Sequence, residues 1–279
     1  MPIISVYQHG STSGTPPMRN DHDRAKRQNC KGWSPKTARS NTAFLRSVVL
    51  DDLNGIGFAF TLTLKNCPET HADWHKLRRS MELRLRRMGM LRIHWVTEWQ
   101  RRGVPHLHGV VYFPESIENG HRIPSAIIDH WLSAGLKYSC RPQSQNVKPI
   151  TDSLGWLKYL AKHASRGAHH YQRASENIPK GWENTGRMWG KVGTWPTAEP
   201  MKFELTREGN FSYRRVLRNY RISLARNEGN PRSITAARSM LKSNTRNHSE
   251  VRGTSAWVPE GVSLSILAYL ASSGFDVRQ

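Results

Sequence analysis

Two strand-like runs joined by a short polar turn restrict the folds that this chain can adopt. Residues 91–100 (LRIHWVTEWQ) and 106–113 (HLHGVVYF) are rich in β-branched and aromatic side chains, which favour extended backbone. The residues between them, RRGVP, include a glycine and a proline, which are typical of turns. The pattern therefore predicts a β-hairpin.

Further elements flank this hairpin on both sides. Residues 55–65 read as a strand, in which large apolar side chains alternate with smaller ones. A helix should follow, ending at Gly89, because one apolar face recurs at spacings of three and four: Trp74, Leu77, Met81, Leu85 and Met88.

Downstream, we expect helices over residues 125–135 and 151–165, the second capped by Thr151 or Asp152, and short strands over 136–140 and 146–150. The resulting order, β-α-β-β-α-β-(β)-α, is typical of a split βαβ unit. The predicted fold class is therefore α+β, with a ferredoxin/RRM-like antiparallel sheet, helices packed on it and a small C-terminal extension.

Composition divides the chain into three predicted parts. Residues 1–45 are polar and basic without a sustained period, and we expect a disordered arm. Residues 46–198 contain the elements of the α+β domain. Residues 199–279 should form a basic extension for DNA binding or oligomerisation, with a hairpin over 201–217 and a short helix over 261–273.

The net charge of +21 and the pI near 10.5 indicate a polyanionic partner, most often nucleic acid. A basic soluble protein without such a partner is the alternative. No apolar run reaches the roughly 18 residues of a membrane span, and the N-terminus lacks a secretory pattern. Cys30, Cys67 and Cys140 are scattered, which argues against a disulfide framework or a zinc finger and favours a reducing cytoplasm.

His106 and His108 are the candidate metal ligands. Side chains two apart on a strand point to one face, and the hairpin should bring Glu98 beside them. Two imidazoles and a carboxylate form half of an octahedral shell, which suits Mg²⁺ or Mn²⁺ acting on phosphate, with zinc left open. The alternative is a chance pair on an exposed strand, because thirteen histidines make one such pair unsurprising.

Tyr159 and Lys162 share the polar side of the helix predicted over 151–165, opposite its apolar stripe. A phenol with a pKa of about 10 is a poor nucleophile, but nearby positive charge favours its phenolate form. A tyrosine nucleophile would split a phosphodiester reaction into two reversible steps. His163 is a weaker candidate for a helper, and a surface tyrosine on a basic helix is the alternative.

Two other catalytic patterns are incomplete. His71 and His75 stand four apart, but a zinc hydrolase of the His-Glu-x-x-His type needs glutamate where Ala72 stands. The segment 181–188 (GWENTGRM) lacks the Gly-Lys-Ser/Thr end of a Walker A loop, so we expect no nucleotide-driven helicase here.

In their order along the chain, the strand segment Phe60–Thr63, the pair His106–His108 and the helical Tyr159–Lys162 resemble the three motifs of the HUH endonuclease superfamily. Specifically, the chain is similar to single-tyrosine rolling-circle replication initiators (Rep proteins) of bacterial phages or plasmids. The resemblance implies a metal held by Glu98 and both histidines. It also implies that Tyr159 nicks an origin and keeps the 5′ end, while Lys162 steadies the phosphate or the phenolate.

The same resemblance implies a single-stranded or hairpin origin DNA, a host helicase, a host polymerase and a place in the bacterial host cytoplasm. Six arginines are expected to grip phosphates with strong salt dependence: Arg101, Arg102, Arg214, Arg215, Arg218 and Arg221. Two alternatives remain open at this point, an HUH transposase of an insertion element and a nucleic-acid-binding module without catalysis.

Overall fold

The computed structural model describes residues 1–15, 31–117, 120–165, 172, 174–182, 184–239 and 253–279, except for the side chains of 162–165. Within them the chain forms seven α-helices and two five-stranded antiparallel sheets, so the predicted α+β class is confirmed. The chain divides into two compact units. Unit 1 comprises Met1–Arg24, Arg46–Val48 and Thr197–Gln279, and unit 2 comprises Ala25–Leu45 and Val49–Pro196.

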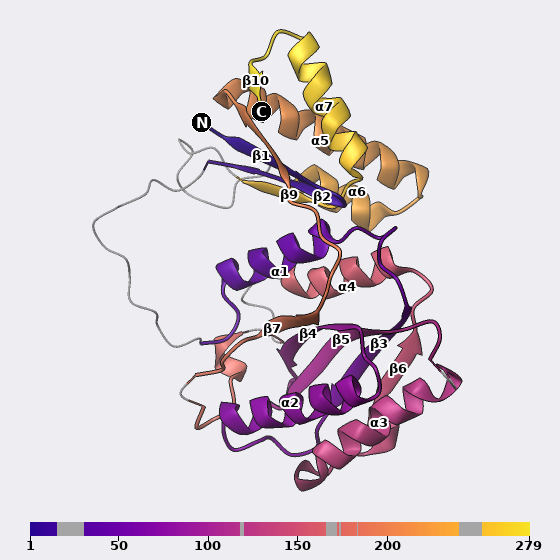
Figure 1. The fold of residues 1–279 in the computed structure, drawn as a ribbon. Helices are drawn as coiled ribbons and strands as arrows, with labels where there is room; N and C mark the ends of the chain where they lie inside the picture. The colour runs from indigo at the N-terminus through magenta and orange to yellow at the C-terminus, as the bar shows by residue number, and fades with distance from the viewer. Residues whose placement is uncertain (16–30, 118–119, 166–171, 173, 183, 240–252) are drawn as a thin grey trace, which may run out of the picture. The chain divides into compact units, whose positions relative to one another are not determined.

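The sheet of unit 2 has the strand order β6-β3-β5-β4-β7 (Figure 1). Its central strands contain the predicted hairpin, with β4 paired antiparallel to β5. The strands are β3 (Ile56–Thr63), β4 (Arg92–Trp99), β5 (Pro105–Phe113), β6 (Asn146–Pro149) and β7 (Trp189–Gly193).

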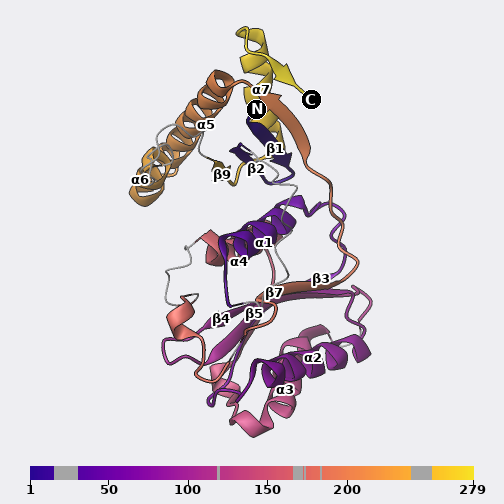
Figure 2. The same ribbon diagram turned by 90° about the vertical axis from the view of Figure 1, so that its left-hand side faces the viewer.

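Helices cover both faces of this sheet, as Figures 1 and 2 show from two directions. One face carries α2 (His71–Arg87) and α3 (Ile123–Ala134), and the other carries α1 (Pro35–Ser47) and α4 (Ser153–Ser165). The sheet is therefore the middle layer of three, and every residue of its central strands β4 and β5 is buried.

The amphipathic pattern of α2 produces the packing that it predicts. Trp74, Leu77, Met81 and Leu85 are all buried, and Thr70 caps the helix by accepting a hydrogen bond from the Asp73 backbone N–H. The rings of Trp74 and of Trp131 on α3 meet edge to face at 5.9 Å. These contacts fix α2 and α3 as a pair against one face of the sheet.

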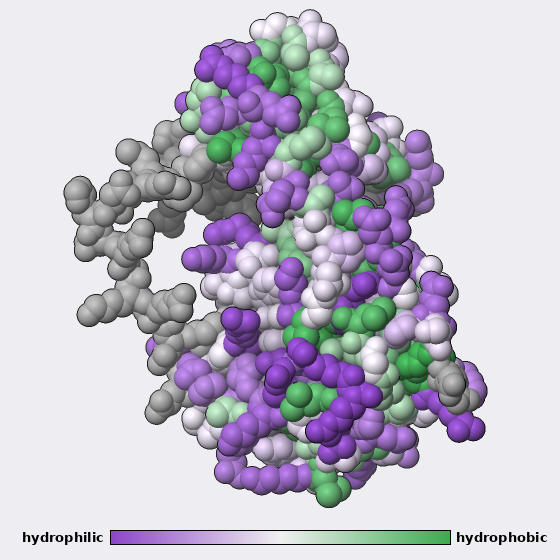
Figure 3. All heavy atoms as spheres, in the orientation of Figure 1, coloured by the Kyte–Doolittle hydropathy of each residue, from purple (hydrophilic) through white to green (hydrophobic). Residues whose placement is uncertain are grey.

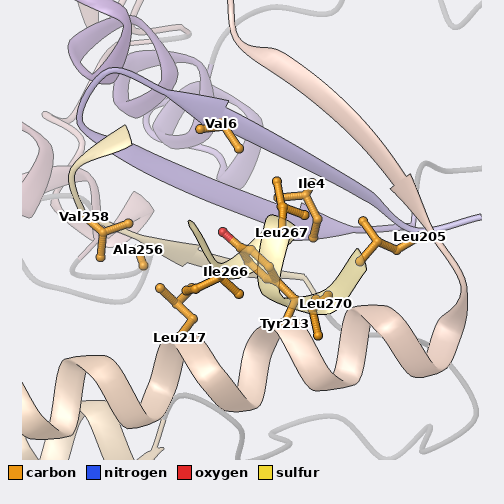
Figure 4. Close-up of a cluster of buried hydrophobic side chains, with 10 residues drawn as sticks. All are labelled: Ile4, Val6, Leu205, Tyr213, Leu217, Ala256, Val258, Ile266, Leu267 and Leu270. Atoms are coloured by element: carbon orange, nitrogen blue, oxygen red, sulfur yellow. The ribbon is translucent and has the colours of Figure 1, made fainter. Parts of the chain in front are cut away.

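In the part of unit 1 that the structure describes, the chain forms a sheet of order β10-β8-β1-β2-β9 and three helices. The strands are β1 (Ile3–Tyr7), β2 (Gly10–Gly14), β8 (Met201–Leu205), β9 (Thr254–Ala256) and β10 (Val277–Arg278). The helices are α5 (Arg207–Asn227), α6 (Pro231–Ser239) and α7 (Glu260–Ser272), and α7 lies where a C-terminal helix was predicted. Figure 4 shows the core between them, formed by Ile4, Val6, Leu205, Tyr213, Leu217, Ala256, Val258, Ile266, Leu267 and Leu270.

The expected disordered arm over residues 1–45 differs from the structure wherever those residues are described. Residues 3–14 form β1 and β2, and residues 35–47 form α1. The reason is a long-range pairing: β1 lies between β2 and β8, and β8 comes from the far end of the chain. Only Ile4 and Val6 of this five-residue strand are buried, and an alternation that short does not predict a strand without its partner.

Two local predictions are also wrong. The strand expected over 136–140 is a 3₁₀ turn over Leu136–Tyr138, followed by Ser139 with φ of 55°. The hairpin expected over 201–217 is β8 followed directly by α5, because Thr206 caps a helix by accepting from the Gly209 backbone N–H at 3.1 Å.

Candidate metal and tyrosine site

The register of the central hairpin brings three ligand side chains together. Glu98 on β4 stands opposite His106 on β5, and His108 stands two residues further along the same strand. All three therefore project from one face of the sheet, the face that α1 and α4 cover. The glycine after this pair, Gly109, is needed because a Cβ there would overlap the Phe60 ring.

The three side chains converge on one point. The two imidazole Nε2 atoms of His106 and His108 are 3.1 Å apart, and Glu98 Oε2 is 3.9 Å and 3.5 Å from them respectively. Ligands about 2.1 Å from one ion stand roughly 3.0 Å apart at a right angle and roughly 3.4 Å apart at the tetrahedral angle. The 3.1 Å and 3.5 Å separations are close to these values and the 3.9 Å separation is wider, while the donor set of two imidazoles and a carboxylate suits a divalent cation. No other group of three such residues forms among the residues described.

Burial sets the character of this cluster. Glu98 is 0% exposed, and the two histidines are 9% and 5% exposed. A buried carboxylate needs a compensating positive charge, and a metal ion or a protonated imidazole can supply it. A cation bound at this cluster would therefore offset the charge of the buried Glu98 carboxylate.

Thr61 on β3 is a neighbour that the sequence reasoning did not single out. It stands opposite His108, and its Oγ1 lies 2.8 Å from His108 Nδ1. An Nδ1–H donated to this hydroxyl would leave the Nε2 lone pair directed at the cluster, as metal-binding histidines require. The only signal in the sequence is the alternation of threonine with apolar residues in Phe60–Thr63.

Tyr159 on α4 lies beside the cluster of Glu98, His106 and His108. The helix begins where Asp152 accepts a hydrogen bond from the Gly155 backbone N–H at 2.8 Å, which confirms one of the two predicted caps. The ring of Tyr159 lies 6.3 Å from the ring of His108, edge to face, and 5.1 Å from that of Trp156. The ring of Tyr159 therefore borders the cluster, and because the residue is 38% exposed it is also accessible to solvent.

The backbone of Lys162 and His163 belongs to the same helix, but their side chains lie outside the described residues. Lys162 stands three residues after Tyr159, so it falls on the same side of α4 by helical geometry.

Of the two cations in the hairpin turn, Arg102 is engaged by the protein itself. Its guanidinium donates to the carbonyl oxygens of Lys65 and Leu64 and to Gln100 Oε1. These bonds tie the turn to the end of β3, so Arg102 serves the geometry of the hairpin first. Arg101 is exposed beside it.

The four arginines predicted in unit 1 lie on α5 and differ in exposure. Arg214 is only 3% exposed, with its guanidinium 5.6 Å from the Phe211 ring centroid, which leaves little surface for a phosphate. Arg215 is exposed, Arg218 is half-buried, and burial lowers the pKa of Arg221. The helical arrangement, which the predicted hairpin missed, is what buries Arg214.

Other histidines have structural partners. His75 Nε2 lies 3.2 Å from the carbonyl oxygen of Thr185 and its Nδ1 lies 3.3 Å from Arg78 Nη2, so both ring nitrogens already have protein partners. His94 lies 2.7 Å from Asn41 Oδ1 and is fully buried. Burial, and then the charge of Lys191, lower the pKa of His94 to about 3, so it stays neutral at ordinary pH.

Among the helices that the structure describes, none combines the length and the apolar composition of a membrane-spanning segment.

Comparison with known proteins places these residues in context. Residues 57–168, which include the cluster and Tyr159, match the family described as replication-associated protein ORF2/G2P. The chain is 44% identical to a putative replication protein of Xylella fastidiosa strain 9a5c over 284 residues, covering 99% of both chains. It is 42% identical to the replication-associated protein G2P of Pseudomonas phage Pf3 over 279 residues, again covering 99% of each. No solved structure matches the chain.

Proposed function

The chain belongs to the ORF2/G2P family of replication-associated proteins, and on that premise we propose that it is a metal-dependent, site-specific endonuclease and ligase for single-stranded DNA. It nicks an origin and so starts rolling-circle replication. The observation that carries the proposal is the position of the Tyr159 ring, 6.3 Å from the ring of His108 and beside the Glu98, His106 and His108 cluster.

In the proposed reaction, the Tyr159 hydroxyl oxygen attacks the scissile phosphorus and loses its proton. A phosphorus–oxygen bond to the tyrosine forms and the bond to the 3′ oxygen breaks, so the 5′ phosphate stays on the protein. The 3′ oxygen takes up a proton and becomes a free hydroxyl. Because one phosphodiester replaces another, the 3′ hydroxyl can later attack the phosphotyrosine and reseal the strand.

Glu98, His106 and His108 are the residues that would hold a divalent cation, Mg²⁺ or Mn²⁺. Such a cation would polarise the scissile phosphate and fix its orientation. Thr61 would hold the His108 ring in the orientation that this requires. Lys162 would steady the phosphate or favour the phenolate form of Tyr159, and the partial exposure of Tyr159 would let a DNA strand reach it.

The proposed reaction also requires partner proteins from the host. The free 3′ hydroxyl would prime a host polymerase, and a host helicase would open the duplex because the segment 181–188 is not a Walker A loop. The exposed Arg101 and Arg215 would contact phosphates of the origin. These steps belong in the cytoplasm of a bacterial host.

Two alternatives are weaker. A transposase could use the same tyrosine chemistry, but relatives similar over nearly the whole chain are named for replication. A non-catalytic RRM-like module binds bases on an open face of its sheet, whereas helices cover both faces of the sheet of unit 2. Both observations support an initiator.

Covalent trapping tests the proposal. The protein is incubated with a tiled library of single-stranded oligonucleotides and Mn²⁺ or Mg²⁺, and adducts that survive detergent are sequenced. We expect wild type and Tyr269→Phe, an exposed tyrosine of unit 1, to form the same adduct, and Tyr159→Phe to form none. Glu98→Gln and His106→Ala should lower the yield by about 100-fold or more.

Two results would contradict the proposal. One is an adduct of normal yield with Tyr159→Phe, which would place the nucleophile elsewhere. The other is the absence of any adduct with wild-type protein over the whole library, which would leave a binding protein.

A further inference from the structure

The solvent-facing side of α2 carries a row of cations. Lys76, Arg79 and Arg87 recur with Leu83 between them at spacings of three and four, so all four side chains lie along one stripe of the helix. Each of the four is exposed, Lys76 with 82% and Arg79 with 54% of its side chain. We call these four residues the α2 stripe.

The α2 stripe lies far from the Tyr159 site in the architecture of unit 2. Helix α2 covers one face of the sheet, whereas α4 and the Glu98, His106 and His108 cluster lie on the other face (Figures 1 and 2). The opposite side of α2 is the buried face that contains Trp74 and Leu85. The stripe is therefore a surface separate from the Tyr159 site.

Positive charge on this helix exceeds what the helix itself can neutralise. Within His71–Arg87 there are six lysines and arginines against two acids. One acid, Glu82, is almost completely buried and is shared by Arg78, Arg79 and Arg86. The other, Asp73, accepts a hydrogen bond from the Thr70 hydroxyl and lies 3.9 Å from Lys76. Two carboxylates among six cations leave a surface that attracts an anionic partner.

A neighbouring segment adds to this charge. The exposed Arg187 lies close enough to act electrostatically on His75 and Arg78. The pKa of His75 is lowered, by burial first and then by the charges of Arg78 and Arg187 among others. The anionic partner would therefore meet cations from two segments of unit 2.

The length of this surface matches a short stretch of DNA backbone. A shallow hollow of about 710 Å³ runs along the helix, lined by residues of α2 that include the four of the stripe. Figure 3 shows mostly hydrophilic side chains where α2 lies in Figure 1. From Lys76 to Arg87 the stripe extends about 16 Å at 1.5 Å per residue, which matches about five phosphates of one duplex strand at 3.4 Å each.

The side chains favour duplex over single-stranded DNA. Surfaces for single strands combine cations with aromatic rings on which the bases stack. The α2 stripe offers an exposed leucine, Leu83, at its centre and no Phe, Tyr or Trp. Such a surface can contact phosphates and sugars, and it has nothing on which to stack an unpaired base.

We propose that the α2 stripe binds the phosphate backbone of a DNA duplex, independently of sequence. This surface would hold the double-stranded flank or stem of an origin while the opposite face of the same sheet accepts the single strand. The inference goes beyond the proposed nicking reaction, because binding at α2 requires neither Tyr159 nor a metal.

The test measures binding of a 30-base-pair duplex of mixed sequence over a range of salt concentrations without divalent metal. It uses full-length protein carrying Tyr159→Phe, so the outcome is independent of covalent chemistry. The triple variant Lys76→Gln, Arg79→Gln, Arg87→Gln is compared with a control of equal charge change at exposed lysines elsewhere, Lys148→Gln, Lys180→Gln, Lys202→Gln. Circular dichroism verifies that both variants keep their helix content.

We expect the stripe variant to bind the duplex about 10- to 100-fold more weakly near physiological salt. Its slope of log affinity against log salt should fall by about 2.7, because three phosphate contacts are lost at about 0.9 each. The control variant should keep the slope of the parent protein. With Tyr159 present, the stripe variant should form adducts with a short oligonucleotide as wild type does.

Three results would overturn the inference. The stripe variant could bind duplex as tightly as the control variant. It could lose affinity for a 30-nucleotide oligothymidine as strongly as for duplex, which would remove the assignment to double-stranded DNA. It could lose affinity for polyglutamate while keeping that for duplex, which would identify an acidic protein as the occupant.

Discussion

His108 is held from two sides, and this gives Thr61 a testable role. Thr61 Oγ1 lies 2.8 Å from His108 Nδ1, while His108 Nε2 faces the cluster. Thr61→Val removes the hydroxyl and keeps the shape, so the ring loses its orienting hydrogen bond. We expect Mn²⁺ affinity to fall by about 10- to 100-fold, with adduct formation restored at high Mn²⁺.

Thr63→Val is the matched control for that experiment. Thr63 lies on the same face of β3, opposite His106, and its hydroxyl donates to the carbonyl of Ser144 at 3.3 Å rather than to a histidine. Calorimetric titration of Mn²⁺ compares the two variants. Equal Mn²⁺ affinity in Thr61→Val and wild type would show that the hydrogen bond does not orient the ligand.

His94 makes stability depend on pH. Its pKa is lowered to about 3 by burial and by Lys191, against about 6.5 in the unfolded chain. Between these values only the unfolded chain binds the proton, so stability is fully present above pH 6.5 and falls as pH decreases toward 3. At pH 5 the loss from this group is on the order of 2 kcal/mol.

His94→Gln should remove most of that dependence, because glutamine can donate to Asn41 Oδ1 as the imidazole does but cannot take up a proton. The free energy of unfolding is measured in urea at pH 7.5 and pH 5.0. The variant should show the smaller difference between the two pH values, whatever its absolute stability. An unchanged difference would assign the acid sensitivity to other groups.

Among the elements, α4 delivers the candidate nucleophile, and its first turn depends on one side chain. Asp152 accepts from the Gly155 backbone N–H at 2.8 Å. Asp152→Ala should lower the free energy of unfolding by about 1 kcal/mol, whereas Asp152→Asn, which can still cap, should lose only a few tenths. Urea denaturation of both variants checks this, and equal stability of the two would mean that the cap contributes nothing.

Element type could be predicted where periodicity was long and local. The helix over His71–Arg87 and the hairpin of β4 and β5 follow from side-chain spacing alone. The segment 201–217 resembles a hairpin because a strand-like run over 201–205 is followed by Gly209, which is typical of a turn, and then by Tyr213 and Leu217. Those two residues stand four apart and both belong to the core of unit 1, so helical burial decided the conformation.

For the whole molecule, the two units predict separate responses to a core defect. Ile4 is 0% exposed in the core of unit 1, and truncating such a side chain costs about 2–5 kcal/mol. In Ile4→Ala we expect faster hydrogen exchange in β1, β8 and α5, with β3, β4 and β5 unchanged. Ile56→Ala, at a 36% exposed position, serves as the control with a smaller effect. Equal acceleration in both sheets would show that the units open together.

Side-chain patterns in the sequence predicted the α+β class, the central hairpin and the amphipathic face of α2, and they singled out the residues of the candidate metal and tyrosine site. These features depend on spacings of two to four residues, or on a turn of five, so neighbouring side chains contain the information. The charge of +21 likewise pointed to nucleic acid without any structure.

The remaining features depend on contacts between distant parts of the chain. The strand of residues 3–7 exists because β8, almost two hundred residues later, pairs with it. Thr61 meets His108 because of the register between β3 and β5, and Arg214 is buried because α5 turns it inward. Pairing register and burial depend on partners distant in the chain, and a one-residue shift reverses every side chain of a strand. The spacing of neighbouring side chains therefore does not predict pairing register or burial.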